Sequence, residues 1–304
     1  MIAVIPKLRT VPVGTALLIF AACTDGNGDS AAADAAGAHD AAGTEMHADE
    51  AAAHGPIDLR FASSDEPATY LASYEQDIDW GGAEVARRFG ARYTVTAVGP
   101  GDGSLPATVR LDSLGVGVSS PHGRNVFDTR HLAGTEFEVR IPERGGIPVY
   151  QDEPVFDMGA ALERQVHLSR LVNYAFPELP DHPVEVGDSW TTQTSRQQVE
   201  AYLSMPADLT TEYRFAGWEV VEGVRCAKIE GNLASQMTAH AQLGDGQDVS
   251  YTGTLEGQAT WLFDPGSGTL VRMTAEESSD GLLTQGEKDT PIRQHTQVQI
   301  GLER

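Results

Sequence analysis

Three kinds of residue in this 304-residue chain could carry chemistry: a serine in a glycine turn, a group of histidines, and two cysteines. The serine is Ser189, in the stretch VEVGDSWTTQ (184–193), where an apolar run enters Gly-Asp-Ser. Such a serine acts as a nucleophile if a base lies within hydrogen-bond reach and donors face the oxyanion. The stretch equally suits a tight turn between two strands, because Gly187-Asp188 is a typical turn dipeptide.

The same stretch resembles the first block of the GDSL-type hydrolases, in which this serine is the nucleophile. That family has an Asn-Asp pair and an Asp-x-x-His after the serine. This chain has no such pair after Ser189, and its Asp-x-x-His, Asp128 to His131, precedes the serine. No G-x-S-x-G elbow occurs either. We therefore expect no catalytic residue and no enzyme, and interpret the stretch as strand, turn and strand anchored by Trp190.

Two metal sites can be considered in residues 24–55, and we expect neither. DGNGDS (25–30) begins like a calcium loop, but serine and alanine occupy the sixth and twelfth positions, where that loop needs glycine and glutamate. Copper or zinc needs ligands in a fixed geometry. Nothing in the pattern supplies that geometry for the four candidate ligands His39, Met46, His47 and His54.

The N-terminus has the order of features of a secretory signal. MIAVIPKLRT is basic, the apolar run VPVGTALLIFAA follows, and Cys23 comes directly after small residues. The run is too short to cross a bilayer, which takes about 20 residues. The order resembles a bacterial lipobox, with Phe20 where leucine is usual. That resemblance implies cleavage before Cys23 and its acylation with chains such as palmitate, whereas an ordinary secretory cleavage would leave Cys23 free.

An acylated Cys23 makes the membrane a partner of the chain, because two or more acyl chains give stable anchoring. We then expect the protein in the cell envelope, facing the periplasm or the exterior. Cys226 is the other cysteine. With Cys23 acylated it has no intrachain disulfide partner, and its strand-like surroundings predict a small buried hydrophobe.

The charge of the chain excludes several partners. The formal net charge is −23, and removal of the signal with Lys7 and Arg9 leaves 19 basic residues against 44 acidic ones, or −25. Nucleic acid binding needs clustered lysine and arginine, so we expect none. Docking on anionic lipid headgroups is disfavoured for the same reason. No motif predicts a cofactor.

Composition divides the chain into three parts. Residues 1–22 are the signal peptide. Residues 23–55 carry the lipidated cysteine and a tether rich in Ala, Asp and His, with no aromatic or branched aliphatic residue after Cys23, which predicts disorder. Residues 56–304 are long enough to bury a sizeable core.

Period-two alternation dominates residues 56–304 and predicts an antiparallel β domain. In SYTGTLEGQATWLFD (250–264) apolar side chains fall on one face and polar ones on the other, and DLTTEYRFAG (208–217) alternates likewise. Turns such as DPGSG (264–268) suit strands joined in a meander. Further strands are expected at 69–80, 91–98, 107–118, 135–141, 224–242, 269–277 and 292–302.

One segment departs from this alternation. MGAALERQVHLSRLVNYAF (158–176) places its apolar residues near helical spacing, and prolines follow at 177 and 180. This pattern predicts a helix over 158–176. His167 lies within it, and as a lone histidine is more typical of a surface residue than of a ligand.

Three stretches carry a resemblance to a family. They are FPELPDHPVEVGDSW (176–190), YRFAGWEVVEGVRCAKIEG (213–231) and GQATWLFDPGSGTLVRM (257–273). They resemble a group of uncharacterised bacterial lipoproteins with a Val-Gly-Asp-x-Trp motif, over roughly residues 160–280. In general shape the group is similar to the LolA, LolB and LppX carriers. The resemblance implies a mainly β fold, an antiparallel curved sheet or half-barrel with one central helix, whose concave face holds acyl chains in the carriers.

The first functional hypothesis is a tethered module that binds lipid or another hydrophobic ligand in the hollow of the sheet, because such sites are lined by apolar and aromatic side chains. The alternatives are a non-enzymatic module that binds an envelope protein through a sheet edge or its acidic surface, and the disfavoured hydrolase. The same aromatic stripes could simply fill the core. The candidate ligand-binding residues are Leu171, Tyr174, Tyr213, Phe215, Tyr251, Trp261 and Phe263.

Overall fold

The protein is described here by a computed structural model. The described residues are 44–45, 55–64, 66–97, 99, 103–151, 155–157, 165–167, 172–200, 203–242 and 248–304.

Within these residues the chain forms one antiparallel sheet of 13 strands and a separate two-stranded hairpin. The N-terminal strands are β1 (Thr44–Glu45), β2 (Ala68–Trp80), β3 (Ala83–Ala97), β4 (Ser104–Ser120), β5 (Gly123–Phe127), β6 (Glu136–Pro142), β7 (Val149–Tyr150), β8 (Val155–Asp157) and β9 (Gln165–His167). The C-terminal strands are β10 (Ser189–Glu200), β11 (Leu203–Val221), β12 (Val224–Gln242), β13 (Asp248–Asp264), β14 (Thr269–Gln285) and β15 (Lys288–Leu302).

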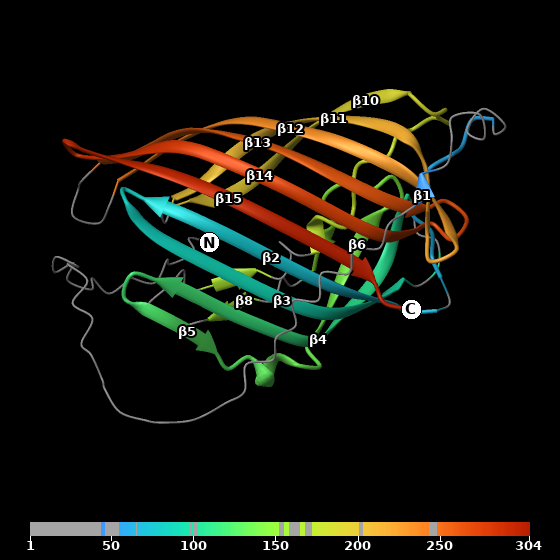
Figure 1. Cartoon of the computed structure of the whole chain (residues 1–304), viewed down its shortest axis with the longest axis horizontal. Coiled ribbons are helices and arrows are strands. Elements are labelled where there is room, and N and C mark those ends of the chain that lie inside the picture. The colour runs from blue at the N-terminus through green and yellow to red at the C-terminus, as the bar shows by residue number, and fades with distance from the viewer. Residues whose placement is uncertain are drawn as a thin grey trace, which may run out of the picture.

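Two meanders build the large sheet. Strands β10 to β15 follow one another in space as in sequence, as do β2, β3, β4 and β6, and the pairing of β15 with β2 joins the two groups. Figure 1 shows the long strands curving together around an interior. In the described residues the two ends of the sheet, at β10 and at β7, do not pair with each other. The mainly β, antiparallel, curved fold expected from the sequence is therefore confirmed, and the sheet is open.

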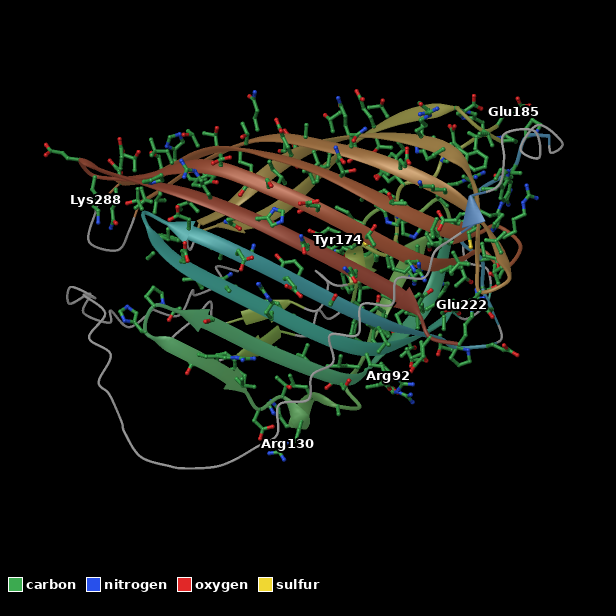
Figure 2. The ribbon with its side chains drawn as sticks, in the orientation of Figure 1. Arg92, Arg130, Tyr174, Glu185, Glu222 and Lys288 are labelled. Atoms are coloured by element: carbon green, nitrogen blue, oxygen red, sulfur yellow. The ribbon has the colours of Figure 1, made fainter. Side chains whose placement is uncertain are left out.

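The strands are longer than the alternation alone predicts. β14 runs to Gln285 and β15 begins at Lys288, whereas the sequence suggested strands ending at 277 and beginning at 292. Figure 2 shows Lys288, where β15 begins, and Glu222, in the turn between β11 and β12, at opposite ends of the sheet. The added segments are rich in polar residues, which pair with polar neighbours on an adjacent long strand and gain their hydrogen bonds from it.

The prediction of a central helix is wrong where it can be checked. Gln165–His167, inside the expected helix at 158–176, is strand β9 and pairs with β8. Val172 and Asn173 make a short helical turn that ends by Phe176, and 158–164 and 168–171 lie outside the described residues. Pairing with β8 supplies the hydrogen bonds that a helix would make, so tertiary context overrides helical spacing here. Among the described residues, no helix is long and apolar enough to cross a bilayer.

Two irregular segments occupy the place expected for that helix. Residues 57–61 and 172–184, here called the inner segments, are joined by the bridge between Ile57 and Val184. Leu59, Phe61 and Leu179 from these segments are buried in the same cluster as inward side chains of the sheet. The inner segments therefore cover part of the concave face and complete its main hydrophobic core.

A β-bulge bends the sheet at the junction of β3 and β4. Arg92 pairs with Ser113 and Tyr93 with Leu111, so Asp112 is an extra residue on β4 without a partner position. A bulge of this kind increases the local twist and curvature of the strand that carries it.

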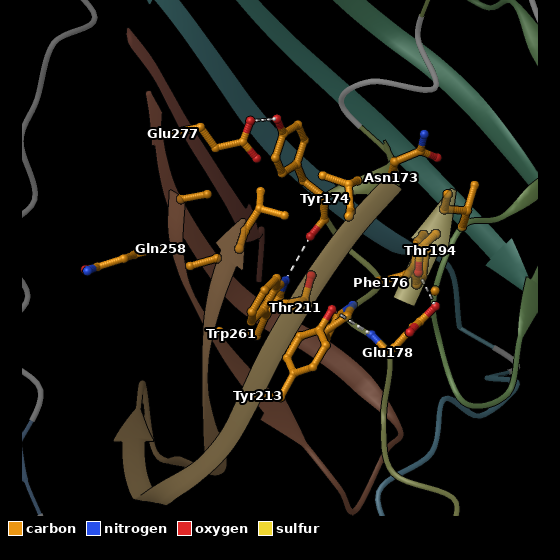
Figure 3. Close-up of a pocket in the computed structure, with 18 residues that line it drawn as sticks. Asn173, Tyr174, Phe176, Glu178, Thr194, Thr211, Tyr213, Gln258, Trp261 and Glu277 are labelled. Carbon is orange, nitrogen blue, oxygen red and sulfur yellow. Dashed lines mark hydrogen bonds between the residues drawn. The ribbon is translucent and has the colours of Figure 1, made fainter. Parts of the chain in front are cut away.

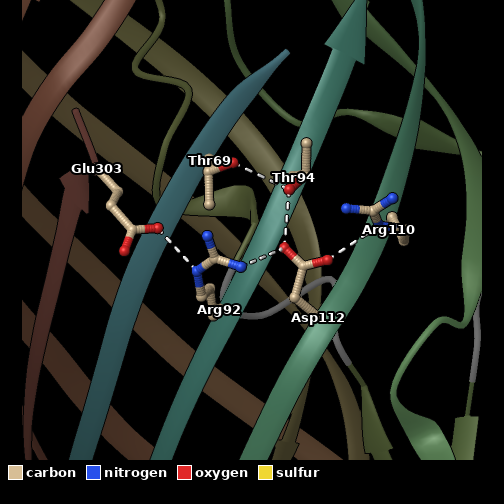
Figure 4. Close-up of polar contacts among 6 residues, drawn as sticks. All are labelled: Thr69, Arg92, Thr94, Arg110, Asp112 and Glu303. Atoms are coloured by element: carbon tan, nitrogen blue, oxygen red, sulfur yellow. Dashed lines mark hydrogen bonds and ion pairs between the residues drawn. The ribbon is translucent and has the colours of Figure 1, made fainter.

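The carboxylate of Asp112 is the centre of a polar network on the outer face (Figure 4). It accepts hydrogen bonds from Thr94 Oγ1 at 2.8 Å and from Arg110 Nε at 2.9 Å, and it pairs with Arg92 at 3.3 Å. Arg92 also binds Glu303 at 2.7 Å, which ties the C-terminal end of the chain to the bulge. Although desolvation alone would raise it, the hydrogen bonds from Thr94 and Arg110 and the two guanidinium charges lower the pKa of Asp112 below its ordinary 3.8.

We expect Asp112→Asn to lower the free energy of unfolding by about 1–2 kcal/mol at neutral pH, because charge-assisted hydrogen bonds are lost. A depressed folded-state pKa gives stability that is present above the unfolded pKa and lost as pH falls through the folded pKa. The difference between the two proteins should therefore shrink below about pH 4. Urea unfolding of residues 24–304, which contain every described strand, measures this at neutral pH and at about pH 3. Asp280→Asn, at an exposed ion pair, is the control. A difference that does not change with pH would contradict the role of the charge.

Candidate functional site

Two indole rings of the sheet hold the inner segment 172–184 over the concave face. Trp261 Nε1 donates a hydrogen bond to the carbonyl oxygen of Tyr174 at 2.9 Å, and Trp190 Nε1 donates to that of Glu178 at 2.8 Å. The amide of Leu179 donates to the carbonyl of Arg144 at 2.6 Å. Because a buried irregular segment must find partners for its backbone outside itself, these contacts fix its position on the sheet.

An aromatic ladder runs from β10 to β13 beneath this segment. The rings of Trp190 and Tyr213 stack with centroids 5.5 Å apart, and those of Tyr213 and Trp261 lie 5.6 Å apart at 48°. Strand β12 lies between β11 and β13, and its Gly231 pairs with Tyr213 on one side and with Ala259, two residues from Trp261, on the other. A Cβ at Gly231 would lie 2.8 Å from Trp261 Cζ3. The missing side chain therefore lets the two rings meet across β12.

The Gly-Asp-Ser stretch forms a turn that leads into β10. Gly187 has a φ of 99°, which favours glycine, and the Asp188 carboxylate accepts a hydrogen bond from the amide of Glu185 at 2.8 Å. Ser189 is exposed at the start of β10, and within the described part of the chain its hydroxyl has no hydrogen-bonded base. Trp190 then anchors the inner segment. Gly187, Asp188 and Trp190 of the Val-Gly-Asp-x-Trp motif thus have a structural role, whereas Val186 is exposed.

Substitution of neighbouring residues tests whether the motif specifies the turn. We expect Asp188→Ala to destabilise the protein by about 1 kcal/mol, because the amide of Glu185 loses its acceptor. Ser189→Ala should change the free energy of unfolding by less than about 0.5 kcal/mol, as is usual at an exposed site. Urea denaturation curves of both variants measure this. A larger loss in Ser189→Ala than in Asp188→Ala would show that the turn is not what the motif specifies.

A cavity of about 130 Å³ lies between the inner segment and the sheet (Figure 3). The sheet side is lined by residues of β10 to β14. The opposite side is lined by Asn173, Tyr174, Phe176, Pro177 and Glu178, together with Gly146 and Ile147. Tyr174, Tyr213 and Trp261 give it aromatic walls, and Glu178 and Glu277 give it two carboxylates. The arrangement can hold a small molecule between aromatic rings and acidic groups.

One inward-facing row of the sheet brings polar residues into the core beside this cavity. Cross-strand pairing aligns Glu277 on β14 with Thr296 on β15, Gln76 on β2 and Arg87 on β3. Glu277, Thr296 and Gln76 are 9%, 6% and 7% exposed. Gln76 Nε2 donates a hydrogen bond to Gln294 at 2.8 Å. This row separates the main core from a second apolar cluster nearer the other end of the strands, so the cavity lies at a boundary between apolar and polar surface.

Hydrogen bonds link the two carboxylates to the cavity walls. Tyr174 OH donates to Glu277 Oε2 at 2.9 Å, and Thr194 Oγ1 donates to Glu178 Oε1 at 2.8 Å. The amide of Glu178 donates to Tyr213 OH at 3.4 Å. Burial raises the pKa of Tyr213, so this phenol stays protonated and remains a donor and acceptor around neutral pH.

The seven residues expected to bind a ligand fall into three groups. Tyr174, Tyr213 and Trp261 line the cavity. Leu171 lies outside the described residues. The other three are fully buried in the core and do not line the cavity: Phe215, Tyr251 and Phe263.

Among the lining residues that the sequence analysis missed, Glu277 and Glu178 are the charged ones. Glu277 had a detectable signal, because it occupies the inward phase of β14 after Met273 and Ala275, where an apolar residue would be usual. Glu178 carried no such signal, since it follows a proline in an irregular segment.

The remaining sequence predictions concern cysteine and metal ligands. Cys226 is a free cysteine, fully buried, and desolvation raises the pKa of its thiol to about 11, so it is the small buried hydrophobe expected. In the described residues no group of three His, Cys, Asp or Glu side chains could hold a metal ion. The remaining candidates lie outside the described residues: Cys23, His39, Met46, His47 and His54.

Comparison with known proteins does not assign the chain to a family. No protein-family model matches it, and no curated protein sequence matches it. A crystal structure of an outer membrane channel from Pseudomonas putida F1 aligns with 82% of this chain and 100% of its own, at 11% identity and a TM-score of 0.22. That of Pseudomonas aeruginosa OccK2 (OpdF) aligns with 81% and 100%, at 8% identity and a TM-score of 0.22. TM-scores this low do not establish a shared fold.

Proposed function

We propose that the protein is a lipoprotein anchored in the cell envelope through acylated Cys23, facing the periplasm or exterior, which binds a small hydrophobic ligand in the cavity of its curved sheet. The order of basic head, apolar run and cysteine supports the anchor. The observation that carries the binding function is the aromatic-walled cavity between the inner segment and the sheet.

The size of the cavity limits what it can hold. At about 130 Å³ it is close to the engineered cavity of roughly 150 Å³ that binds benzene. Drug-sized ligands occupy about 300–1,000 Å³. The cavity therefore suits one ring or a short alkyl chain. If the ligand is a lipid, only the end of one chain or a small headgroup enters.

An envelope module that binds another protein is the second candidate, and the open sheet supports it. β10 pairs with β11 alone among the described strands, so its outer edge is available to an added strand. At the same edge β1 pairs with Val220 and Glu219 of β11. We do not propose a hydrolase, because Ser189 is exposed in a structural turn.

Filling the cavity tests the binding function. Ala259 lines the cavity on β13 and is half-buried. We expect 1-hexanol to bind residues 24–304, and Ala259→Leu to weaken binding by at least about 10-fold, because the added carbons occupy the ligand's space. Isothermal titration calorimetry measures both affinities.

Ala234→Leu is the matched control for this experiment, because Ala234 is exposed on the outer face of β12. It should leave the affinity unchanged. Absence of 1-hexanol binding, or equal effects of the two substitutions, would contradict the proposal and direct the search toward protein partners.

A further inference from the structure

The lining of the cavity is acidic. Among the 18 residues that line it, two are acidic, Glu178 and Glu277, and none is lysine, arginine or histidine. The cavity is partly enclosed by protein, and partial exclusion of water strengthens electrostatic interactions relative to bulk water. An anionic ligand, such as a fatty-acid carboxylate or a phosphate group, would therefore meet repulsion without a compensating donor cation.

Glu277 is the more informative of the two carboxylates. It is 9% exposed, and Tyr174 OH binds one of its oxygens. In the described part of the chain, its other oxygen has no hydrogen-bond partner, and the side chain makes no ion pair. Its neighbour Glu276 points to the outer face, where it is exposed and lies 3.3 Å from His295 Nε2. A buried carboxylate is normally paired with a cation.

Arg87, the basic residue in the same cross-strand row, is not the cation that pairs with Glu277. Arg87 lies three strands from Glu277, a distance of about 14 Å at the usual strand spacing. Its guanidinium group donates to Gln76 at 3.4 Å. Among the residues that the structure describes, none therefore supplies a cation opposite Glu277 within the cavity.

The aromatic walls of the cavity also favour a cationic ligand. The rings of Tyr213 and Trp261 face the cavity from the sheet, and Tyr174 closes it beside Glu277 (Figure 3). A cation over a tryptophan or tyrosine ring is attracted by the negative face of the ring, and aromatic cages recognise quaternary ammonium ions in this way.

We propose that the cavity selects a small organic cation, an amine or quaternary ammonium group that carries a short apolar part, with Glu277 as its counter-ion. This inference rests on the proposed binding function and names the class of ligand for that site. The ammonium group lies between Glu277 and the aromatic rings, and the apolar part lies along Ala259, Ala275 and Leu233.

Three probes with the same alkyl chain test this selectivity on residues 24–304. They are hexyltrimethylammonium, 1-hexanol and hexanoate, which differ in charge. We expect hexyltrimethylammonium to bind at least about 10-fold more tightly than 1-hexanol, and hexanoate to bind most weakly of the three. Titration calorimetry at constant ionic strength gives the three affinities.

Adjacent glutamates on β14 provide the matched substitutions. Glu277→Gln should weaken hexyltrimethylammonium binding by about 10-fold and leave 1-hexanol within about twofold, because only the charge is removed. Glu276→Gln should change neither. If Glu277→Gln does not fold, as judged by circular dichroism, Glu178→Gln serves as a second variant, with a smaller expected loss for the cation alone.

The outcomes distinguish the cation site from the proposed hydrophobic binding function. Binding of 1-hexanol without preference for the cation, or tighter binding of hexanoate, overturns the cation site and leaves the hydrophobic cavity. Equal losses in Glu277→Gln and Glu276→Gln also overturn it. If none of the three probes binds, both proposals fail.

Discussion

The structure depends on hydrogen bonds to the backbone of an irregular segment that crosses the concave face of the sheet. Residues 172–184 have no strand partner over most of their length, so their polar groups need donors and acceptors from elsewhere. The indoles of Trp190 and Trp261 supply two donors. Backbone groups of Arg144 and Gly146 supply an acceptor and a donor. Without these contacts the sheet would expose much of the apolar face that now forms its main core.

Close packing of this segment requires glycine at Gly145. Its φ is 73°, and a Cβ there would lie 1.8 Å from the carbonyl oxygen of Pro177. Such an approach leaves no room for any other residue. The same logic applies at Gly231, over which the rings of Tyr213 and Trp261 meet. Missing side chains thus place the aromatic ladder and the segment above it, and the cavity is the space that this arrangement leaves beside Glu277.

Much of the fold follows from local sequence pattern, and the site does not. Alternation reveals strands such as β12, whose bounds match the predicted 224–242, and it places Trp261 on the inner face. It cannot reveal cross-strand register, which aligns Glu277 with Gln76 and Arg87 across four strands. The helix expected at 158–176 failed for a related reason, because pairing of Gln165–His167 with β8 is a tertiary event. Likewise, three of the seven aromatic and aliphatic candidates fill the core, since alternation separates inner from outer faces but not cavity from core.

Amide hydrogen exchange tests the docking of the inner segment most directly. The amide of Leu179 is bound to the carbonyl of Arg144, and the amide of Gly146 to that of Phe176. If these contacts hold the segment on the sheet, both amides should exchange slowly, at rates near those of β12 to β14, because they open only when the core opens. Exchange at the rate of an unstructured loop, while the central strands remain protected, would show that the segment is not held there. The cavity beneath it would then have no permanent wall.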